Sequence, residues 1–249
     1  MINSDPPVIK DLVLVGGGHA HVSVLKSFGM HSLAGVRVTL ISQETQSPYS
    51  GMLPGYIAGH YSFDETHIDL GPLSGFAGAR FFNDEVIGLD TERRHLICRN
   101  RPDVYYDVLS IDIGSTPITS GIAGADDNAI PVKPIDGFLQ NWQYFLEGIK
   151  NKNDKIKIGV VGAGAAGVEL ILAIQYRLEK EFKDKGRDKT DLEFHLFCDS
   201  DEILVTYNPR VRAKFLRVLK QRGINLHTGH RVTEVGEHSI RCQNGVSIN

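Results

Sequence analysis

The sequence predicts an α/β protein with two domains of similar type, because one pattern of strand, glycine turn and helix is written twice along the chain. "DLVLVGGGHAHVSVLKSF" begins at Asp11, and "IKIGVVGAGAAGVELILAI" begins at Ile156. An apolar strand follows each of them, "VRVTLIS" from Val36 and "LEFHLFCD" from Leu192. A strand, a helix and a second strand in this order build a parallel sheet covered by helices. We therefore expect one such sheet in each half of the chain.

The region between the two units changes character and predicts an antiparallel β meander attached to the first domain. Its short β-rich runs, broken by Gly, Asp, Asn and Pro, are "ARFFNDEVIGLD", "RRHLICRN" and "VYYDVLSIDIGS". A loop-like crossing follows, and then a helix with Phe138, Trp142, Phe145 and Leu146 on one face. The predicted domain ranges are 1–118, 119–154 for the crossing and helix, and 155–249.

Composition and charge exclude several classes of protein. The 249 residues are 41% hydrophobic and 23% charged with a net charge of −3, which is ordinary for a globular protein and offers no bulk attraction to nucleic acid. No apolar run is long enough to span a bilayer and the N-terminus lacks a signal-peptide layout, so we expect a cytoplasmic protein. The basic helix "NPRVRAKFLRVLKQRGI" is expected to pack Val211, Phe215, Val218 and Leu219 on a sheet, although a peripheral membrane contact is left open.

The second glycine loop, "GAGAAG", predicts a dinucleotide site. Gly162 permits the tight turn, Gly164 lets a pyrophosphate approach the backbone, and Gly167 lets the helix pack closely on the strand. The pyrophosphate is then expected at the helix N-terminus, beside Ala165, where free N–H groups favour an anion. Asp199 follows the next strand and is expected to accept a hydrogen bond from a ribose 2′-hydroxyl, which favours NAD over NADP.

The first loop, "GGGHAH", carries a weaker signal, because His21 stands where the third glycine is expected. Gly16 and Gly18 still serve the turn and the phosphate, and the helix start around Ala20 still offers N–H groups. His19 is a candidate donor to a pyrophosphate or a packing residue, whereas His21 is expected to cap and pack. The next strand ends at Ser42 and Gln43, with Glu44 one step late, and either Ser42 or Glu44 is a candidate for the ribose contact.

The cysteines do not form a redox pair. Cys98, Cys198 and Cys242 are an odd number and make no C-x-x-C or similar spacing. We therefore expect neither a structural disulfide nor a redox-active dithiol, and no metal site.

Four local motifs carry a resemblance to a known family. The loops occur in the order of the two-dinucleotide flavoproteins, the pyridine nucleotide-disulphide oxidoreductases, in which the first site binds FAD and the second NAD(P)H. "SPYSGMLPGYIAG" resembles the segment beside the isoalloxazine in the NADH dehydrogenase-like branch, and "NDEVIGLD" resembles the strand whose backbone meets adenine. "YDVLSIDIGSTP" resembles the end of the first FAD half, and "GAGAAGVEL" matches the NAD fingerprint. The site positions that this resemblance adds are Pro48, Tyr49, Ser50, Gly51, Val86, Gly114, Ser115 and Glu169.

The resemblance implies an FAD-dependent oxidoreductase built from two Rossmann-like FAD/NAD(P)-binding domains. Hydride is expected to pass from NAD(P)H, with NADH favoured, to flavin and on to a quinone-like or other small acceptor without a thiol relay. Glu169 is expected near the nicotinamide–flavin contact, and Lys133 is either a residue beside the flavin that stabilises its reduced anion or a solvated surface lysine. A homodimer is left open.

The length of the chain departs from the family. Family members return from the NAD domain to complete the FAD domain, whereas this sequence stops after "RCQNGVSIN", which reads as a hairpin with Asn244-Gly245 at its turn. We therefore expect an incomplete first domain, a missing C-terminal part of the second, and a truncated chain.

Two rival functions stay open at this point. "GGGHAH" and "YSGMLPG" most resemble the module fused to selenide, water dikinase. The chain is therefore alternatively a truncated, non-catalytic nucleotide-binding or docking module associated with a selenophosphate-forming partner. The other rival is a flavin oxidase or monooxygenase with one nucleotide site and a chance second loop.

Overall fold

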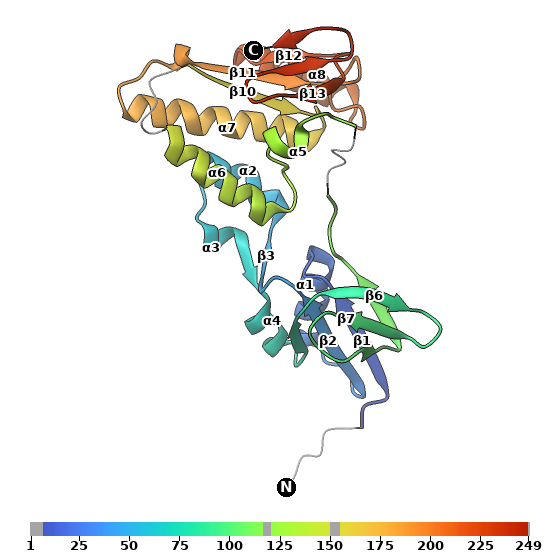
Figure 1. Cartoon of the computed structure of the whole chain (residues 1–249). Helices are drawn as coiled ribbons and strands as arrows, with labels where there is room; N and C mark the ends of the chain where they lie inside the picture. Colours follow the sequence, from blue (N-terminus) through green and yellow to red (C-terminus); the bar gives the residue numbers. More distant parts are fainter. Residues whose placement is uncertain (1–6, 117–120, 150–154, 249) are drawn as a thin grey trace. The chain divides into compact units, whose positions relative to one another are not determined.

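The computed structural model describes residues 7–116, 121–149 and 155–248, and the chain divides into two compact units. The first unit comprises Met1–Ser50 and Phe63–Ser115, and the second comprises Gly51–Ser62 and Thr116–Asn249 (Figure 1). The predicted α/β class is confirmed, because each unit contains a parallel sheet with helices. The predicted domain ranges, 1–118, 119–154 and 155–249, stay a prediction.

The first unit is built on a four-stranded parallel sheet with the strand order β5-β2-β1-β9. Its strands are β1 (Lys10–Val15), β2 (Val36–Ser42), β5 (Arg80–Asn83) and β9 (Val108–Ile111). β1 pairs with β2 from Lys10 opposite Val36 to Val15 opposite Ile41. Because all four strands run in the same direction, their carboxyl ends meet at one edge of the sheet, where α/β proteins hold their ligands.

Successive residues of β1 point to opposite faces of this sheet and build two cores. Leu14 packs on one face with Leu25 of α1 (His19–Met30) and Leu70 of α4 (Leu70–Phe76). Val13 and Val15 pack on the other face against the meander. The smaller elements of this part are β3 (Gln46–Pro48), which pairs antiparallel with β4 (His67–Asp69), and α3 (Phe63–Thr66). The 3-10 turn η1 (Ser50–Met52) lies where the chain passes from the first unit to the second.

The meander is smaller than the sequence predicts. Its strands β6 (Val86–Asp90), β7 (His95–Cys98) and β8 (Val104–Tyr105) are antiparallel, as expected. The flanking runs are not part of it: β5 joins the parallel sheet beside β2, and β9 joins it beside β1. The prediction of one continuous meander was wrong because a short apolar run has the same composition in either sheet, and its partner strand lies far away in the sequence.

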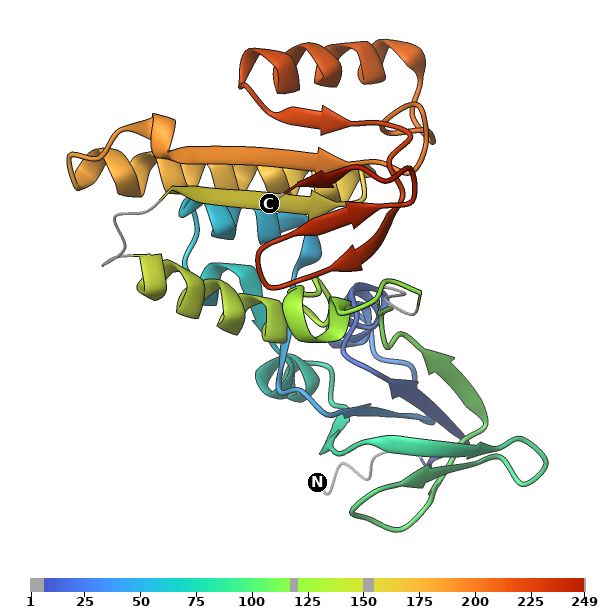
Figure 2. The same cartoon turned by 45° about the horizontal axis from the view of Figure 1, so that its top comes forward.

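The second unit repeats the arrangement with β10 (Ile156–Val161), β11 (Leu192–Phe197) and β12 (Asn225–His227), all parallel. β11 lies between the other two strands (Figure 2). α7 (Ala165–Asp184) follows β10, and α8 (Pro209–Gln221) joins β11 to β12. The remaining helices are α2 (Leu53–Ala58), α5 (Ala125–Asn128), α6 (Ile135–Ile149) and the 3-10 turn η2 (Lys189–Asp191).

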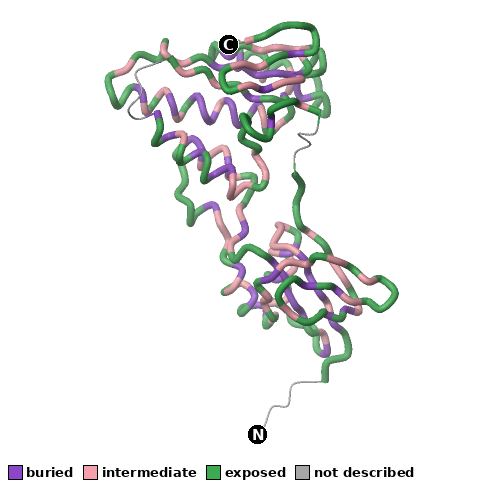
Figure 3. The backbone as a smooth tube through the Cα atoms, in the orientation of Figure 1, coloured by how far each residue is buried: buried purple, intermediate pink, exposed green. Residues whose placement is uncertain are grey.

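One large core holds the second unit together. Ile171 and Leu178 of α7 are fully buried, and they belong to the same cluster as Trp142 and Leu146 of α6 and Ile57 of α2. Figure 3 shows buried positions, in purple, along both α7 and α6. The predicted apolar face of α6 is confirmed, with Phe145 packed against the cluster beside the buried residues.

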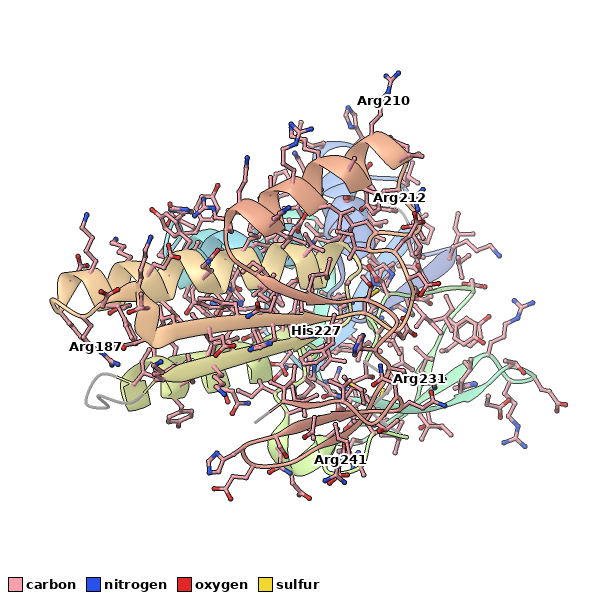
Figure 4. The ribbon with its side chains drawn as sticks, turned by 90° about the horizontal axis from the view of Figure 1, so that it is seen from above. Arg187, Arg210, Arg212, His227, Arg231 and Arg241 are labelled. Carbon is pink, nitrogen blue, oxygen red and sulfur yellow. The ribbon has the colours of Figure 1, made fainter. Side chains whose placement is uncertain are left out.

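α8 also packs as a surface helix. Leu219 is buried, and Val211 and Phe215 lie against the core, as predicted. Arg212 pairs with Glu202, whereas Arg210 is exposed and projects outward from the start of the helix (Figure 4). Among the described residues, no helix combines the length and apolar character that crossing a bilayer requires.

A second meander follows β12. It consists of β13 (Val232–Val235), β14 (Ile240–Cys242) and β15 (Ser247–Ile248). The predicted turn at Asn244-Gly245 is confirmed, because Gly245 has φ +82° and donates its N–H to the carbonyl of Cys242 at 3.0 Å. The order of strand, helix, strand and later meander is therefore the same in both units.

Candidate functional site

The second glycine loop forms an open turn at the carboxyl end of β10. Gly162 has φ +107°, a backbone conformation that favours glycine, and its N–H donates to the carbonyl of Phe197 at 2.9 Å. A Cβ added to Gly162 or Gly164 would meet nothing within 4 Å. The space above the loop is therefore open for a ligand to approach the backbone.

The N-terminus of α7 presents unpaired donors to this space. Gly164 is its N-cap with φ −73° and ψ −176°, no side chain caps it, and no acidic residue lies in its first turn. The first N–H groups of a helix have no partner within the helix, so those that begin at Ala165 can bind an anion. This geometry fits a pyrophosphate.

Gly167 is required for packing. A Cβ at this position would lie 1.8 Å from the carbonyl oxygen of Gly162, far inside contact distance. The start of α7 therefore lies directly against the turn, which is the role that the sequence assigns to the third glycine.

The first loop has the same backbone arrangement. Gly16 has φ +91°, and its N–H donates to the carbonyl of Ile41 at 2.8 Å, as Gly162 donates to Phe197. The two hydrogen bonds align the strands that follow the loops, β2 and β11. Two residues after each carbonyl stand Gln43 and Asp199, so Gln43 rather than Glu44 occupies the position equivalent to Asp199.

His21 replaces the third glycine by bridging the loop to β9. Its Nδ1 lies 2.7 Å from the carbonyl oxygen of Gly16, its Nε2 lies 2.8 Å from Ser110 Oγ, and the side chain is buried. The packing role predicted for His21 is confirmed. In the first loop the imidazole of His21 lies between the helix and the turn. In the second loop the helix lies directly against the turn at Gly167.

His19 is the first residue of α1 and leaves one nitrogen unsatisfied. Its ring lies edge-on to Tyr49, with centroids 4.6 Å apart, and its Nε2 is buried without a hydrogen-bond partner. Tyr49 is 45% exposed, and its N–H donates to the carbonyl of Thr66 at 2.8 Å. His19 therefore keeps an unused polar atom beside the glycine loop.

The structure adds one residue that the sequence did not single out, Asp112. Its Oδ2 accepts a hydrogen bond from the N–H of Ala20 at 2.9 Å, and its carbonyl accepts one from Gly18 at 3.2 Å. A Cβ on Gly18 would lie 2.2 Å from this carboxylate. An internal anion thus occupies the start of α1, so the first loop fits a pyrophosphate only when the Asp112 side chain turns away. Asp112 and Ala20 are 92 residues apart, so local sequence gave no signal.

The other positions predicted for the first cofactor lie at several points of the chain. Ser42 is buried at the end of β2, while Gly114 and Ser115 are exposed after β9. Val86 begins β6 and is half-buried. Pro48 ends β3, and Ser50 and Gly51 lie in η1.

Three further predicted residues belong to the second unit. Asp199 is exposed just after β11 and accepts a hydrogen bond from Ser200 Oγ at 3.2 Å. Glu169 is exposed near the start of α7, and Lys133 is half-buried just before α6.

The cysteines form no pair. All three are free and buried, and burial raises the pKa of the Cys98 and Cys242 thiols, which disfavours the reactive thiolate. Within the ranges that the structure describes, no three His, Cys, Asp or Glu side chains gather as a metal site.

A histidine pair lies between β11 and β12. His195 Nδ1 is 3.0 Å from His227 Nε2, and the ring of Phe197 stacks on that of His227. Burial, and then the neighbouring His195 and His230, hold the pKa of His227 below its usual value. The sequence gave no sign of this pair, because the two residues meet only through the register of the sheet.

Comparison with protein families decides the relationship. The family model "Pyridine nucleotide-disulphide oxidoreductase" matches residues 10–248. The chain belongs to that family. Its relatives include NADH dehydrogenase-like proteins. The "External alternative NAD(P)H-ubiquinone oxidoreductase B1, mitochondrial" of Solanum tuberosum is 22% identical over 94% of this chain and 44% of its own length. The "Type II NADH:quinone oxidoreductase" of Haemophilus influenzae is 23% identical over 96% of this chain and 62% of its own.

Solved structures support the fold of this family member. The NDH2 protein of Plasmodium falciparum, solved in complex with NADH, has a TM-score of 0.79 at 21% identity and covers 96% of this chain. This chain covers 52% of that structure. It spans about half the length of the relatives that it matches.

Proposed function

We propose that this family member is part of an FAD-dependent oxidoreductase that takes hydride from NAD(P)H and passes electrons to a quinone-like acceptor. The observation that carries the proposal is the pair of glycine loops, each after the first strand of a parallel sheet and each tied by the same hydrogen bond to the neighbouring strand. The named activities of the relatives from Solanum tuberosum and Haemophilus influenzae support the reaction class.

The second loop is proposed to bind NAD(P)H. Its pyrophosphate would be held by the N–H groups at the start of α7, because neither Gly164 nor any acidic side chain caps them. Gly162 and Gly167 keep the turn and the helix in place, and Ala165 begins the helix. Asp199 favours NADH over NADPH, since a carboxylate attracts a 2′-hydroxyl and repels a 2′-phosphate.

The first loop is proposed to bind FAD, which when bound supplies the two-electron chemistry. Asp112 has to release the N–H of Ala20 before a pyrophosphate takes that place. The unused Nε2 of His19 is available as a donor to the cofactor or as an acceptor. The other residues proposed to surround the cofactor are Gly16, Gly18, Ser42, Gln43, Pro48, Tyr49, Ser50, Gly51, Val86, Gly114 and Ser115.

Two residues of this chain are proposed to act beside the reacting rings. Glu169 is exposed on the same helix whose start would hold the pyrophosphate. Lys133 is proposed to offset negative charge on the reduced cofactor. No thiol relay is proposed, because the buried cysteines are unpaired.

Several finer points stay proposals from the sequence alone. They are the association with a selenophosphate-forming partner, the peripheral membrane contact, the homodimer and the cytoplasmic location. The first rests on "GGGHAH" and "YSGMLPG", and the second on the basic face of α8.

The experiment that tests the proposed nucleotide site is NADH binding by Gly164→Asp. Asp is a favourable N-cap residue and the position is open, so the variant should fold, while its carboxylate repels a pyrophosphate. Gly137→Asp is the matched control, because it adds the same charge to the first turn of α6 in the same unit. We expect at least a tenfold loss of affinity in Gly164→Asp and none in the control. Equal affinity in both variants would refute the site.

A further inference from the structure

Three arginines line an open cavity on the surface of the first unit that the proposed reaction does not use. The cavity has a volume of about 390 Å³, and Arg37, Arg80 and Arg101 share its wall with Asp11, Phe82 and Tyr105. Asp11, Arg37 and Arg80 stand at the amino ends of β1, β2 and β5. The glycine loop lies at the opposite, carboxyl end of β1, so the cavity is separate from the proposed cofactor site.

Arg37 and Arg80 share one carboxylate unequally. Arg37 donates from Nε and Nη2 to the two oxygens of Asp11, at 2.6 and 2.9 Å, in a bidentate pair. Arg80 donates instead to the neutral hydroxyl of Thr39, at 3.0 and 2.6 Å, and its Nη2 lies 3.9 Å from Asp11. Burial, and then the positive charge of Arg37, lower the pKa of Arg80; Asp11 opposes them, and Arg101 adds a smaller lowering effect. Arg80 therefore makes its short hydrogen bonds to a neutral hydroxyl and shares Asp11 with Arg37 only at the longer distance.

Arg101 is held in place by an aromatic ring. Its Cζ lies 3.6 Å from the centroid of Phe82, and the Cζ of Arg80 lies 5.2 Å from the same centroid. Its Nε is 3.5 Å from Asp84 Oδ2, but that carboxylate already accepts N–H groups from Glu85 and Asn100. The Nε of Arg101 is buried without a hydrogen-bond partner. Phe82 thus fixes two guanidinium groups beside one cavity.

We propose that this cavity binds a small phosphorylated molecule, with its phosphate group among Arg37, Arg80 and Arg101. The lining places three guanidinium groups against two carboxylates, Asp11 and Asp103, while a third carboxylate, Asp84, lies outside the lining beside Arg101. A phosphate group offers three oxygens and up to two charges to these donors, whereas a carboxylate offers two oxygens and one charge. The volume lies within the range of small-molecule sites, which is roughly 300–1,000 Å³. Pro102, Val104 and the ring of Tyr105 supply an apolar wall for the rest of the molecule.

The test is a titration of the ¹⁵N-labelled protein with phenyl phosphate, followed by amide shifts. We expect saturable shifts at residues 80–82, 101 and 103–105, which separates this site from phosphate bound at residues 16–18. Arg80→Gln and Arg101→Gln should each weaken this binding by about tenfold, the usual loss for one charge-assisted hydrogen bond. Arg93→Gln is the control, because its side chain is 83% exposed on the turn between β6 and β7, and it should bind like the unmodified protein.

Three results would overturn the proposal. The first is amide shifts that are confined to the glycine loops. The second is an unchanged affinity for phenyl phosphate in Arg101→Gln. This variant keeps the hydrogen bonds between Arg80 and Thr39, so a folding defect is not expected to complicate its result. The third is equal shifts with benzoate at the same ionic strength, which would remove the preference for phosphate.

Discussion

Replacing Asp112 by Asn should increase the affinity for FAD and lower the free energy of unfolding of the ligand-free protein. The side chain keeps its size and still accepts a hydrogen bond from the N–H of Ala20, but it loses the charge that now occupies the start of α1. Two like charges about 4 Å apart cost about 1 kcal/mol in water and about 4 kcal/mol at the effective dielectric constant of a protein surface. Asp112 is half-buried, so we take about 1–2 kcal/mol, which corresponds to roughly five- to thirtyfold in affinity.

The same substitution removes a favourable interaction between a carboxylate and a helix N-terminus. This interaction is worth about 0.3–1 kcal/mol, so the free energy of unfolding of the ligand-free protein should fall by that amount. The assays are a fluorescence titration with FAD and a urea unfolding curve. A higher affinity for FAD together with a lower free energy of unfolding would show that the Asp112 carboxylate competes with the cofactor for the start of α1.

Asp90→Asn is the matched control for this prediction. Asp90 also accepts a backbone N–H, that of Arg93 at 2.9 Å, but in the turn of the meander, away from the loop. Its FAD affinity should not change. Unchanged or weaker FAD binding in Asp112→Asn would refute the reasoning, because it would mean that the carboxylate does not compete with the phosphates.

Three further predictions follow from the second unit. Asp199→Ser should shift the ratio of NADH to NADPH affinity toward NADPH by about tenfold, because it removes one negative charge near a 2′-phosphate; an unchanged ratio would remove Asp199 from the ribose site. Gly167→Ala should lower the free energy of unfolding, measured by urea unfolding, by at least about 1–3 kcal/mol, because its Cβ would lie 1.8 Å from the carbonyl oxygen of Gly162. Gly148→Ala is the control: a Cβ there meets open space, so this variant should not be destabilised. The pKa of His227 is lower in the folded protein than its unfolded value of about 6.5, so folding favours the neutral imidazole. The free energy of unfolding should therefore fall as the pH drops below about 6.5. This fall should be smaller in His227→Gln but unchanged in the control His238→Gln, whose side chain is 88% exposed.

Features that repeat locally could be predicted from the sequence. The alternation of apolar strand, glycine turn and amphipathic helix located β1, α1, β10 and α7, and the pair Asn244-Gly245 located the last turn. The chemistry of Gly162, Gly164 and Gly167 follows from their spacing, and the structure gives each of them the corresponding surroundings. These signals lie within one element and its neighbours, where short-range sterics decide the conformation.

Features that depend on distant pairing could not be predicted. β5 and β9 join the parallel sheet because β2 and β1 offer them edges, which no local pattern reveals. Asp112 reaches Ala20 only through the pairing of β9 with β1. The arginine cavity likewise needs the start of β5 beside that of β2.

The most direct test of the account is anaerobic addition of NADH to the protein after it has been loaded with FAD, with the visible flavin absorbance as the readout. We expect NADH to bleach the flavin band, and we expect Gly164→Asp to keep the flavin but lose the bleaching. A flavin band that stays unchanged in the unmodified protein while NADH binds would contradict the proposed transfer of hydride between the two sites.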